Sequence, residues 1–168
     1  MDSRINLRLL EPTDSLEELT QLINRAYAVP AALGVQLEGA TQGVDRTRQR
    51  IARGICWVAH ADDGKLVGTA TVSAGWADPA CAYLSRPGLV CRYQLAVEPE
   101  LHGVGVGHAL RQETERWAKA HDFTEMAGFT DESHSKQIRA ALRDGAAIVD
   151  RVTWPGDKHA HVVYAKPL

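Results

Sequence analysis

The repeat of apolar and polar positions along the chain predicts the order of its elements. Short apolar or alternating runs, which are typical of strands, occur at residues 5–10, 55–60, 66–73, 90–97, 124–129, 146–154 and 160–166. Apolar residues at helical spacing predict a first helix that reaches Tyr27: Leu16, Leu19, Leu22, Ile23 and Ala26. Further helices are predicted at 45–53, 105–121 and 134–143. The strand, helix, strand order over 90–129 predicts a parallel pair with a right-handed crossover.

Capping and breaking residues predict where the helices begin and end. Ser15 with Glu18 resembles a capping box, and Pro30 is expected to end the first helix. Residues 131–133, Asp-Glu-Ser, are expected to cap the helix that starts at His134, and Gly145 is expected to end it. Residues 31–43 and 74–89 have no clear period and are predicted to be loops.

The strand at 90–97 runs into a turn and then a glycine-rich helix start, His102-Gly103-Val104-Gly105-Val106-Gly107. The first amides of a helix have no internal partners, and the helix dipole adds positive charge there. Glycines also let a ligand approach the backbone closely. This turn is therefore predicted to bind a phosphate or pyrophosphate, and the alternative is a tight turn needed only for packing.

Two common phosphate-binding motifs do not fit this stretch. A P-loop needs Gly-Lys-Ser/Thr, but the glycines here lead into His108-Ala109. A dinucleotide fingerprint needs a third glycine three residues after the second, and both ways of counting reach His108 or Leu110 instead. The missing third glycine therefore argues against a nucleotide-binding domain of the Rossmann type.

Leu95-Ala96-Val97-Glu98-Pro99, followed by the glycine turn, resembles motif A of the GCN5-related N-acetyltransferase (GNAT) superfamily. The resemblance implies that loop amides hold the pyrophosphate of acetyl-CoA while the strand pairs with its pantetheine arm. The implied cofactor-binding residues are Leu95, Ala96, Val97, His102, Gly103, Val104, Gly105, Val106, Gly107 and His108. His102 stands where the family usually has Arg or Gln, so a side-chain contribution at this position is in question.

The order of elements also resembles the GNAT family along nearly the whole chain. A hairpin turn at Gly64, with a bulge expected at Gly68, is similar to the hairpin that precedes motif A. The resemblance implies an α/β (α+β) fold in one domain over residues 1–168. Its mixed central sheet would have six to seven strands flanked by about four helices, and would be splayed between the fourth and fifth strands. Loop 74–89, which contains Trp76 and Pro79, would line the acceptor side.

The proton-transfer residues do not follow the family's usual pattern. Aligned on Gly145, Ala141 occupies the position of the tyrosine that often protonates the thiolate, and His134 that of an asparagine. Cys91 falls where some histone-acetylating relatives have a glutamate base. We expect His134 and Tyr93 to be the catalytic residues, with Glu132 and Tyr164 as further candidates; His134 as an exposed helix start and Tyr93 as a packed aromatic are the alternatives.

Charge and composition narrow the possible partners. The chain has 168 residues and a net charge of −2, which does not indicate a nucleic-acid partner. It has no apolar run of the ~20 residues that span a bilayer. Neither a secretory signal nor a disulfide pattern is evident, so a cytoplasmic location is expected. A strongly basic face on the second helix is expected to be solvated, although it could instead contribute charge to the acceptor pocket: Arg46, Arg48, Arg50 and Arg53.

These observations predict an N-acetyltransferase that moves the acetyl group of acetyl-CoA to a primary amine of a small molecule or peptide. Acetyl-CoA would be the acyl donor and no metal is expected, because His159 and His161 lack a nearby third ligand. A homodimer is compatible with the resemblance. The alternative is a non-catalytic module that binds or senses acyl-CoA on the same fold, which the missing tyrosine would explain.

Overall fold

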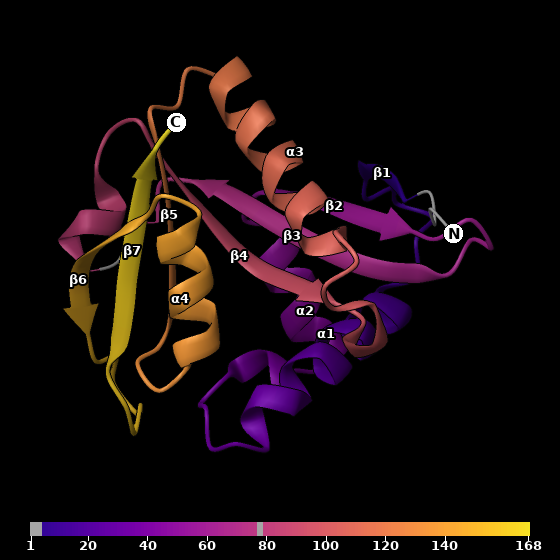
Figure 1. Ribbon diagram of the computed structural model, residues 1–168, viewed down its shortest axis with the longest axis horizontal. Helices are drawn as coiled ribbons and strands as arrows, with labels where there is room; N and C mark the ends of the chain where they lie inside the picture. Colours follow the sequence, from indigo (N-terminus) through magenta and orange to yellow (C-terminus); the bar gives the residue numbers. More distant parts are fainter. Residues whose placement is uncertain (1–4, 77–78) are drawn as a thin grey trace.

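The computed structural model describes residues 5–76 and 79–168 and contains a seven-stranded mixed sheet (Figure 1). The strand order is β1-β2-β3-β4-β5-β7-β6. The strands are β1 (Asn6–Leu9), β2 (Ile55–His60), β3 (Leu66–Ala74), β4 (Leu89–Val97), β5 (Glu125–Asp131), β6 (Ala147–Val152) and β7 (His161–Pro167). The helices are α1 (Leu16–Ala31), α2 (Val44–Ile51), α3 (Val106–Ala120) and α4 (Ser135–Arg143), with short 3₁₀ helices η1 (Glu38–Ala40), η2 (Ala82–Ser85) and η3 (Pro99–Leu101).

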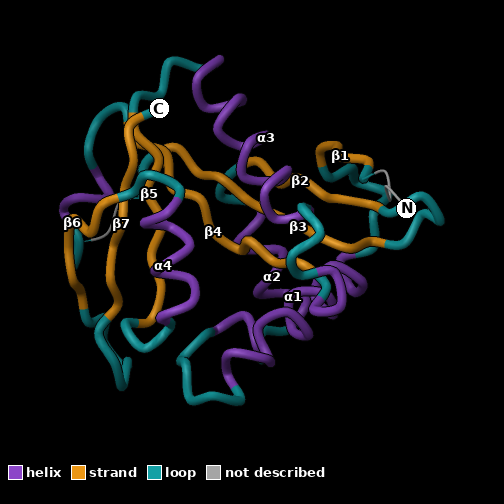
Figure 2. Tube along the Cα trace, in the orientation of Figure 1, coloured by secondary structure: helices purple, strands orange, loops and turns teal. Residues whose placement is uncertain are grey.

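Helices cover both faces of this sheet. Figure 2, in the same orientation as Figure 1, shows α3 and α4 on the near face, with α1 and α2 on the far one. Neighbouring strands are antiparallel except β4 and β5, which are parallel as the sequence predicted. The mixed sheet with four helices confirms the predicted fold class. None of the helices in the described residues is long and apolar enough to cross a membrane.

The largest hydrophobic cluster lies between α3 and strands β2, β3 and β4. Val106 and Leu110 are fully buried here. A Cβ atom on Gly68 of β3 would lie 2.9 Å from Cγ1 of Val106 and 3.0 Å from Cδ1 of Leu110, so this glycine lets α3 pack closely on the sheet. The pairing with β2 also shifts beside Gly68, as the sequence predicted. Tight packing here fixes where α3 begins.

The first helix does not end at Pro30, and that prediction was wrong. α1 continues through Pro30 to Ala31, and its end comes near Gly34, which has a φ of +87°. Proline removes its own amide hydrogen bond and its ring crowds the carbonyl four residues earlier, but its φ is fixed near the helical value, so the helix continues for one more residue. The carbonyl of Pro30 still accepts from the amide of Leu33 at 3.0 Å.

The predicted cap of α4 was also wrong. The residue that precedes α4 is His134, and its side chain makes no capping hydrogen bond to the helix. Asp131 is instead the last residue of β5, and its carboxylate accepts hydrogen bonds from loop amides. A short acidic stretch before a helix can therefore serve a tertiary contact rather than the helix start.

Candidate active site

Strands β4 and β5 separate in the middle of the sheet. They pair in parallel only at Leu89↔Glu125, Val90↔Met126 and Cys91↔Ala127. Beyond these pairs the two strands diverge, as Figures 1 and 2 show. The divergence opens a gap between the second half of β4 and Gly128–Asp131 of β5, which is the splay that the sequence predicted.

A β-bulge in β4 lies at the edge of this gap. Thr71 of β3 pairs with Tyr93 and Thr69 with Ala96, so β4 has an extra residue at this point. Gln94 has a φ of +50°, which is unusual for a residue other than glycine. Such a bulge removes backbone groups from the ladder and leaves them available to a ligand.

Side chains from the α1–α2 region hold the bulge in place. The hydroxyl of Tyr27 donates to the carbonyl of Leu95 at 3.1 Å, and Nε2 of Gln42 donates to Oε1 of Gln94 at 2.9 Å. Burial raises the pKa of Tyr27 to about 12, so its hydroxyl stays protonated and can donate. Gly39 permits this arrangement, since a Cβ there would overlap the Tyr27 ring. No motif in the sequence pointed to Tyr27, Gln42 or Gln94.

The glycine turn lies between the end of β4 and the start of α3. Gly103 and Gly105 have φ values of +84° and +98°, and a Cβ at either position would meet no atom within 4 Å. The amide of Ala109 donates to the carbonyl of Gly105 at 2.9 Å. The amides of Val106, Gly107 and His108 precede it and have no carbonyl one turn earlier to bind. The turn is thus shaped as an open, amide-lined anion site.

Side chains in this turn contribute less than its backbone. His102 is exposed, and its Nε2 lies 3.2 Å from the carbonyl of Val97, so the ring bridges the turn and β4. The Val106 side chain is fully buried in the core under α3, and only its amide is available to a ligand. His108 and Val104 are exposed.

A cavity of about 700 Å³ lies along the gap. It is lined by β4 and β5, by α4, by the α1–α2 region and by the β6–β7 loop. Both predicted catalytic residues, His134 and Tyr93, line it, as do Leu95 and Tyr164. Trp76 and Pro79 line it too, as expected for their loop. Glu132 is not among the lining residues and forms an ion pair with Arg151.

His134 and Tyr93 differ in what their polar atoms bind. Nδ1 of His134 is hydrogen-bonded to Oγ1 of Thr130 at 3.0 Å, which leaves Nε2 to exchange a proton. Burial lowers the pKa of His134, so the ring is neutral at pH 7. The hydroxyl of Tyr93 donates to the carbonyl of Arg50 at 2.6 Å, and burial raises its pKa. Tyr93 therefore holds α2 against β4 with its only proton.

Tyr164 of β7 reaches toward the gap from the other side. It pairs with Gly128, the first residue of β5 beyond the parallel pairing. A Cβ at Gly128 would lie 2.8 Å from the Tyr164 ring and 2.9 Å from its hydroxyl, so the ring lies directly over Gly128. The hydroxyl accepts from Nε2 of Gln137 on α4 at 3.1 Å, and burial raises its pKa.

Two positions at which the resemblance implied a possible acid or base group are inert here. Ala141 of α4 is buried and has no polar atom in its side chain. Cys91 of β4 is fully buried, and burial raises the pKa of its thiol to about 12. A thiol with that pKa stays protonated near neutral pH and cannot act as a base.

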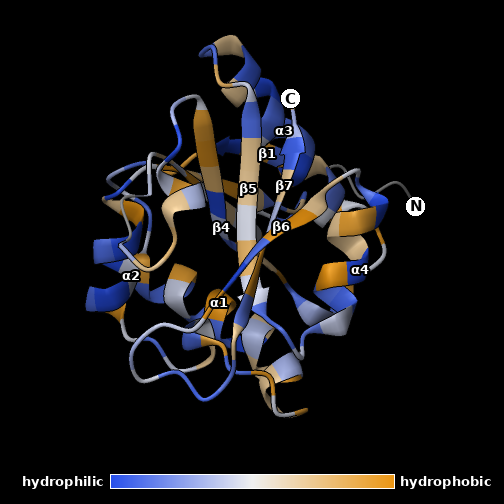
Figure 3. Ribbon diagram, turned by 90° about the vertical axis from the view of Figure 1, so that its left-hand side faces the viewer, coloured by the Kyte–Doolittle hydropathy of each residue, from blue (hydrophilic) through white to orange (hydrophobic). Residues whose placement is uncertain are grey.

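The arginines of α2 and of the turn after it border the cavity, which is the alternative that the sequence left open, although Arg53 is also exposed to solvent. Arg46, Arg50 and Arg53 line the cavity, whereas Arg48 is exposed and pairs with Asp45. Figure 3 shows predominantly hydrophilic residues along α2. A helix that borders a cavity presents polar residues to the cavity as well as to solvent, so its sequence pattern does not separate the two sides.

Asp131, at the end of β5, fastens two loops at the cavity mouth. Its buried carboxylate accepts from the amide of Gln36 at 2.7 Å and from the amide of Ser133 at 2.8 Å, and it lies 2.7 Å from Nδ1 of His159. These bonds hold the pKa of Asp131 well below its usual value against the opposing effect of burial. Nδ1 of His161 lies 3.2 Å from a carboxylate oxygen of Asp157, and burial lowers the pKa of this ring. Among the described residues, no three His, Cys, Asp or Glu side chains are placed to hold a metal ion.

A network of charged side chains lies on the α3–α4 side of the gap. Lys166 of β7 lies 3.1 Å from Oε1 of Glu115 on α3 and 3.3 Å from Asp144 after α4. Arg92 of β4 lies 3.5 Å from Glu115. The network connects β4 and β7, which lie on opposite sides of the gap, to α3 and α4. Few backbone hydrogen bonds join the two sides, since β4 and β5 pair at only three positions.

A protein-family model matches residues 16–145 and is described as the acetyltransferase (GNAT) family. The chain belongs to the GNAT acetyltransferase family. The match covers the glycine turn, both sides of the splay and α4. No curated protein sequence matches the chain at a significant level.

Solved GNAT structures share the fold at low sequence identity. A putative phosphinothricin N-acetyltransferase has 17% identity and a TM-score of 0.73, with 98% of this chain and 99% of that chain covered. The ribosomal-protein-S18-alanine N-acetyltransferase of Escherichia coli has 14% identity and a TM-score of 0.73, with 98% and 94% covered. A Bacillus subtilis acetyltransferase in complex with CoA has 20% identity and a TM-score of 0.67, with 98% and 99% covered.

Proposed function

We propose that this GNAT protein is an N-acetyltransferase that transfers the acetyl group of acetyl-CoA to a neutral primary amine of a small molecule or peptide. One observation carries the proposal: the gap between β4 and β5 has an amide-lined anion site near one side and a lined cavity along the other. The named relatives act on a small molecule in one case and on a protein in another, so both acceptor types remain within the proposal.

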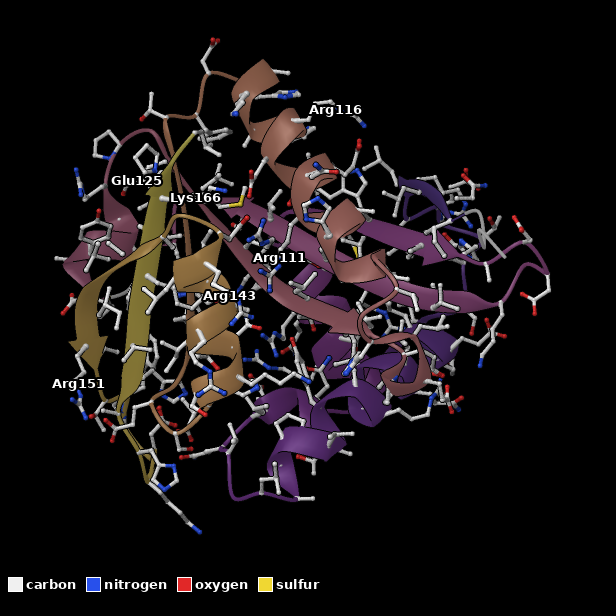
Figure 4. The ribbon with its side chains drawn as sticks, in the orientation of Figure 1. Arg111, Arg116, Glu125, Arg143, Arg151 and Lys166 are labelled. Atoms are coloured by element: carbon white, nitrogen blue, oxygen red, sulfur yellow. The ribbon has the colours of Figure 1, made fainter. Side chains whose placement is uncertain are left out.

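The chain's own residues fit acetyl-CoA. The free amides of Val106, Gly107 and His108 suit its pyrophosphate, and the backbone at Gly103 and Gly105 is open, since a Cβ at either glycine would meet no atom within 4 Å. Strand β4 from Leu95 to Val97 offers backbone partners beside its bulge. Arg111 of α3 and Arg143 of α4 lie between those two helices in Figure 4, where they add positive charge on this side of the gap. When bound, acetyl-CoA supplies the acetyl group as an activated thioester.

The residues around the gap divide the proton transfers between two groups. Nε2 of His134 accepts the proton that the attacking amine loses, because this ring is neutral at pH 7. The hydroxyl of Tyr164 supplies a proton to the departing thiolate, since position 141 has an alanine and no tyrosine. Exchange with solvent then returns the proton to Tyr164 and removes the one held by His134. A backbone amide at the β4 bulge polarises the reacting carbonyl. Tyr93, whose proton is donated to the Arg50 carbonyl, positions α2 beside the acceptor.

Catalysis is favoured over a purely binding role by what lines the cavity. A module that only sensed acyl-CoA would need the glycine turn but not a 700 Å³ cavity beyond the gap. The cavity also contains a neutral histidine and a tyrosine hydroxyl. The alternative, a non-catalytic acyl-CoA module, predicts CoA binding without turnover on any amine.

Two measurements test the proposal in sequence. Thermal unfolding should shift upward with CoA or acetyl-CoA and not with NAD or ATP, and ligand at ~100 times its dissociation constant should add about 2.7 kcal/mol of stability. Release of the CoA thiol from acetyl-CoA should then depend on an added amine. Absence of any shift with millimolar CoA would contradict the CoA site, and a shift without amine-dependent release across a broad panel would favour the binding module.

A further inference from the structure

Three arginines line the cavity from the α2 side. Arg46, Arg50 and Arg53 are three or four residues apart, so they project in a similar direction from α2 and the turn after it. Glu38 forms ion pairs with Arg46 and, at 3.5 Å, with Arg50. Within residues 5–76 and 79–168, no carboxylate lies within ion-pair distance of Arg53, whose guanidinium stacks over the Trp76 ring at 5.2 Å.

Backbone contacts fix the positions from which these side chains project. The Tyr93 hydroxyl binds the carbonyl of Arg50 at 2.6 Å, and Oγ of Ser73 donates to the carbonyl of Arg53 at 3.0 Å. The next residue, Gly54, lies so close to β3 that a Cβ would come within 1.9 Å of the Val72 carbonyl oxygen. The arginines are therefore carried on backbone that is fastened to β3 and β4.

The charges that line the cavity do not balance. Three guanidinium groups, those of Arg46, Arg50 and Arg53, face two carboxylates, those of Glu38 and Asp157. Arg92 also lines the cavity, but Glu115 outside it lies 3.5 Å from its guanidinium. Glu38 is already bound by two arginines, and Asp157 lies 3.2 Å from His161. A cavity with excess positive charge disfavours a cationic ligand and attracts an oxyanion. Guanidinium groups bind oxyanions through paired hydrogen bonds.

An aromatic wall lies next to the arginines. Ring centroids are 5.0 Å apart for Tyr93 and Trp76, 5.5 Å for Trp76 and Phe129, and 5.1 Å for Phe129 and Trp154. All four rings line the cavity. Such a wall accommodates an apolar or aromatic body, while the neighbouring arginines bind a charged group on the same molecule.

We propose that the acceptor is a small primary amine that also carries a carboxylate or another oxyanion and an apolar or aromatic body, as an α-amino acid does. Arg50 and Arg53 bind the oxyanion, and the aromatic wall holds the body. The positive charge also favours the neutral form of the amine, which is the form that attacks. This inference rests on the proposed function, since it names the acceptor of that reaction.

The test compares acids with matched amines that lack only the carboxylate. L-Tyrosine and tyramine, L-phenylalanine and phenethylamine, and L-leucine and isoamylamine are titrated calorimetrically into the protein, with and without saturating CoA. We expect at least one acid to bind ~10- to 100-fold more tightly than its amine, as one charge-assisted hydrogen bond would give. Arg53→Gln and Arg50→Gln should each remove most of that preference. Arg48→Gln is the control, because Arg48 is exposed and outside the cavity.

The outcomes separate this inference from the proposed function. If CoA binds but the amines bind as tightly as their acids, or no acid binds, the oxyanion site is wrong and the acetyltransferase assignment stands. If CoA does not bind, the assignment fails, and the titrations without CoA still decide the anion preference. A preference for acids that survives both Arg50→Gln and Arg53→Gln would also contradict the proposal.

Discussion

The hydroxyl of Tyr164 accepts a hydrogen bond from Nε2 of Gln137 at 3.1 Å, which joins β7 to α4 beside the gap between β4 and β5. Gln137 precedes Ala141 by one helical turn, so both side chains lie on the same side of α4. The contact brings a phenolic hydroxyl from the last strand to the helix side where Ala141 lacks one. It also fixes the direction of that hydroxyl without consuming its proton.

Removing the Tyr164 hydroxyl should slow catalysis without weakening CoA binding. General acids typically contribute ~100- to 10,000-fold, so Tyr164→Phe should lower kcat by at least the low end of that range. The ring remains in place over Gly128, so folding should be nearly unchanged. Steady-state kinetics with acetyl-CoA, together with the CoA dissociation constant, measure the two effects separately.

Two further variants make the Tyr164 prediction sharper. Gly128→Ala keeps the hydroxyl but puts a Cβ 2.8 Å from the ring, so it should displace Tyr164 and lower kcat in the same direction. Tyr83→Phe is the matched control, since Tyr83 lies outside the cavity. A Tyr164→Phe enzyme with kcat within about twofold of wild type, far less than the acid–base range, would show that the thiolate leaves without this acid.

His134 should act on the amine side of the reaction. His134→Ala is expected to lower kcat by at least ~100-fold and to leave CoA affinity nearly intact. Because burial lowers its pKa, the base form is lost only below pH ~6.5, so kcat/KM of the wild type should fall on that acid limb. A pH–rate profile of both proteins tests this. His121→Ala is the control, because His121 is exposed and lies outside the cavity. If the profile of His134→Ala stays within about twofold of wild type, His134 takes no part in proton transfer.

Gly105→Asp should abolish CoA binding in a protein that still folds. The substitution puts a carboxylate at the start of α3 where the pyrophosphate would approach the amides, and it strains a residue with a φ of +98°. Gly64→Asp makes the same change at a φ of +83° in the β2–β3 hairpin turn, so it controls for strain and charge. Both variants should lose ~1 kcal/mol of stability, and only Gly105→Asp should fail in a CoA titration. Equal CoA affinity in the two would place the phosphate site elsewhere.

Asp131 should contribute stability in a pH-dependent manner. Its pKa is lowered in the folded protein, so its stabilising effect is complete above the unfolded pKa near ~4 and is lost as pH falls toward the folded value. Asp131→Asn should cost ~2 kcal/mol at pH 7, because a buried acceptor of several bonds is replaced. Chemical denaturation at several pH values measures this difference, which should shrink below pH ~4. Asp62→Asn, at an exposed turn, should change stability by less than ~0.5 kcal/mol, and an equal loss there would contradict the role of Asp131.

The sequence by itself determined the order of elements, the parallel pair and the glycine turn. These features are local: periodicity selects strand or helix, and glycines at a helix start expose amides whatever packs around them. The sequence also showed directly that position 141 has an alanine and not a tyrosine. Local rules failed at Pro30, because α1 continues through this proline. They also failed at Asp131, because its carboxylate accepts a hydrogen bond from the amide of Gln36 instead of capping α4.

Only the tertiary structure decided which side chains surround the gap. Tyr164 reaches the gap because the β5–β7 register puts it opposite Gly128, and that register depends on pairing between residues 30 or more positions apart in the chain. No glycine or proline in the sequence indicates the bulge at Gln94. Tyr27 and Gln42 of the α1–α2 region hold it in place through hydrogen bonds. Arg46 and Arg50 of α2 face the cavity because packing orients that helix. Periodicity predicts which face is polar, and only packing determines whether that face meets solvent or a site.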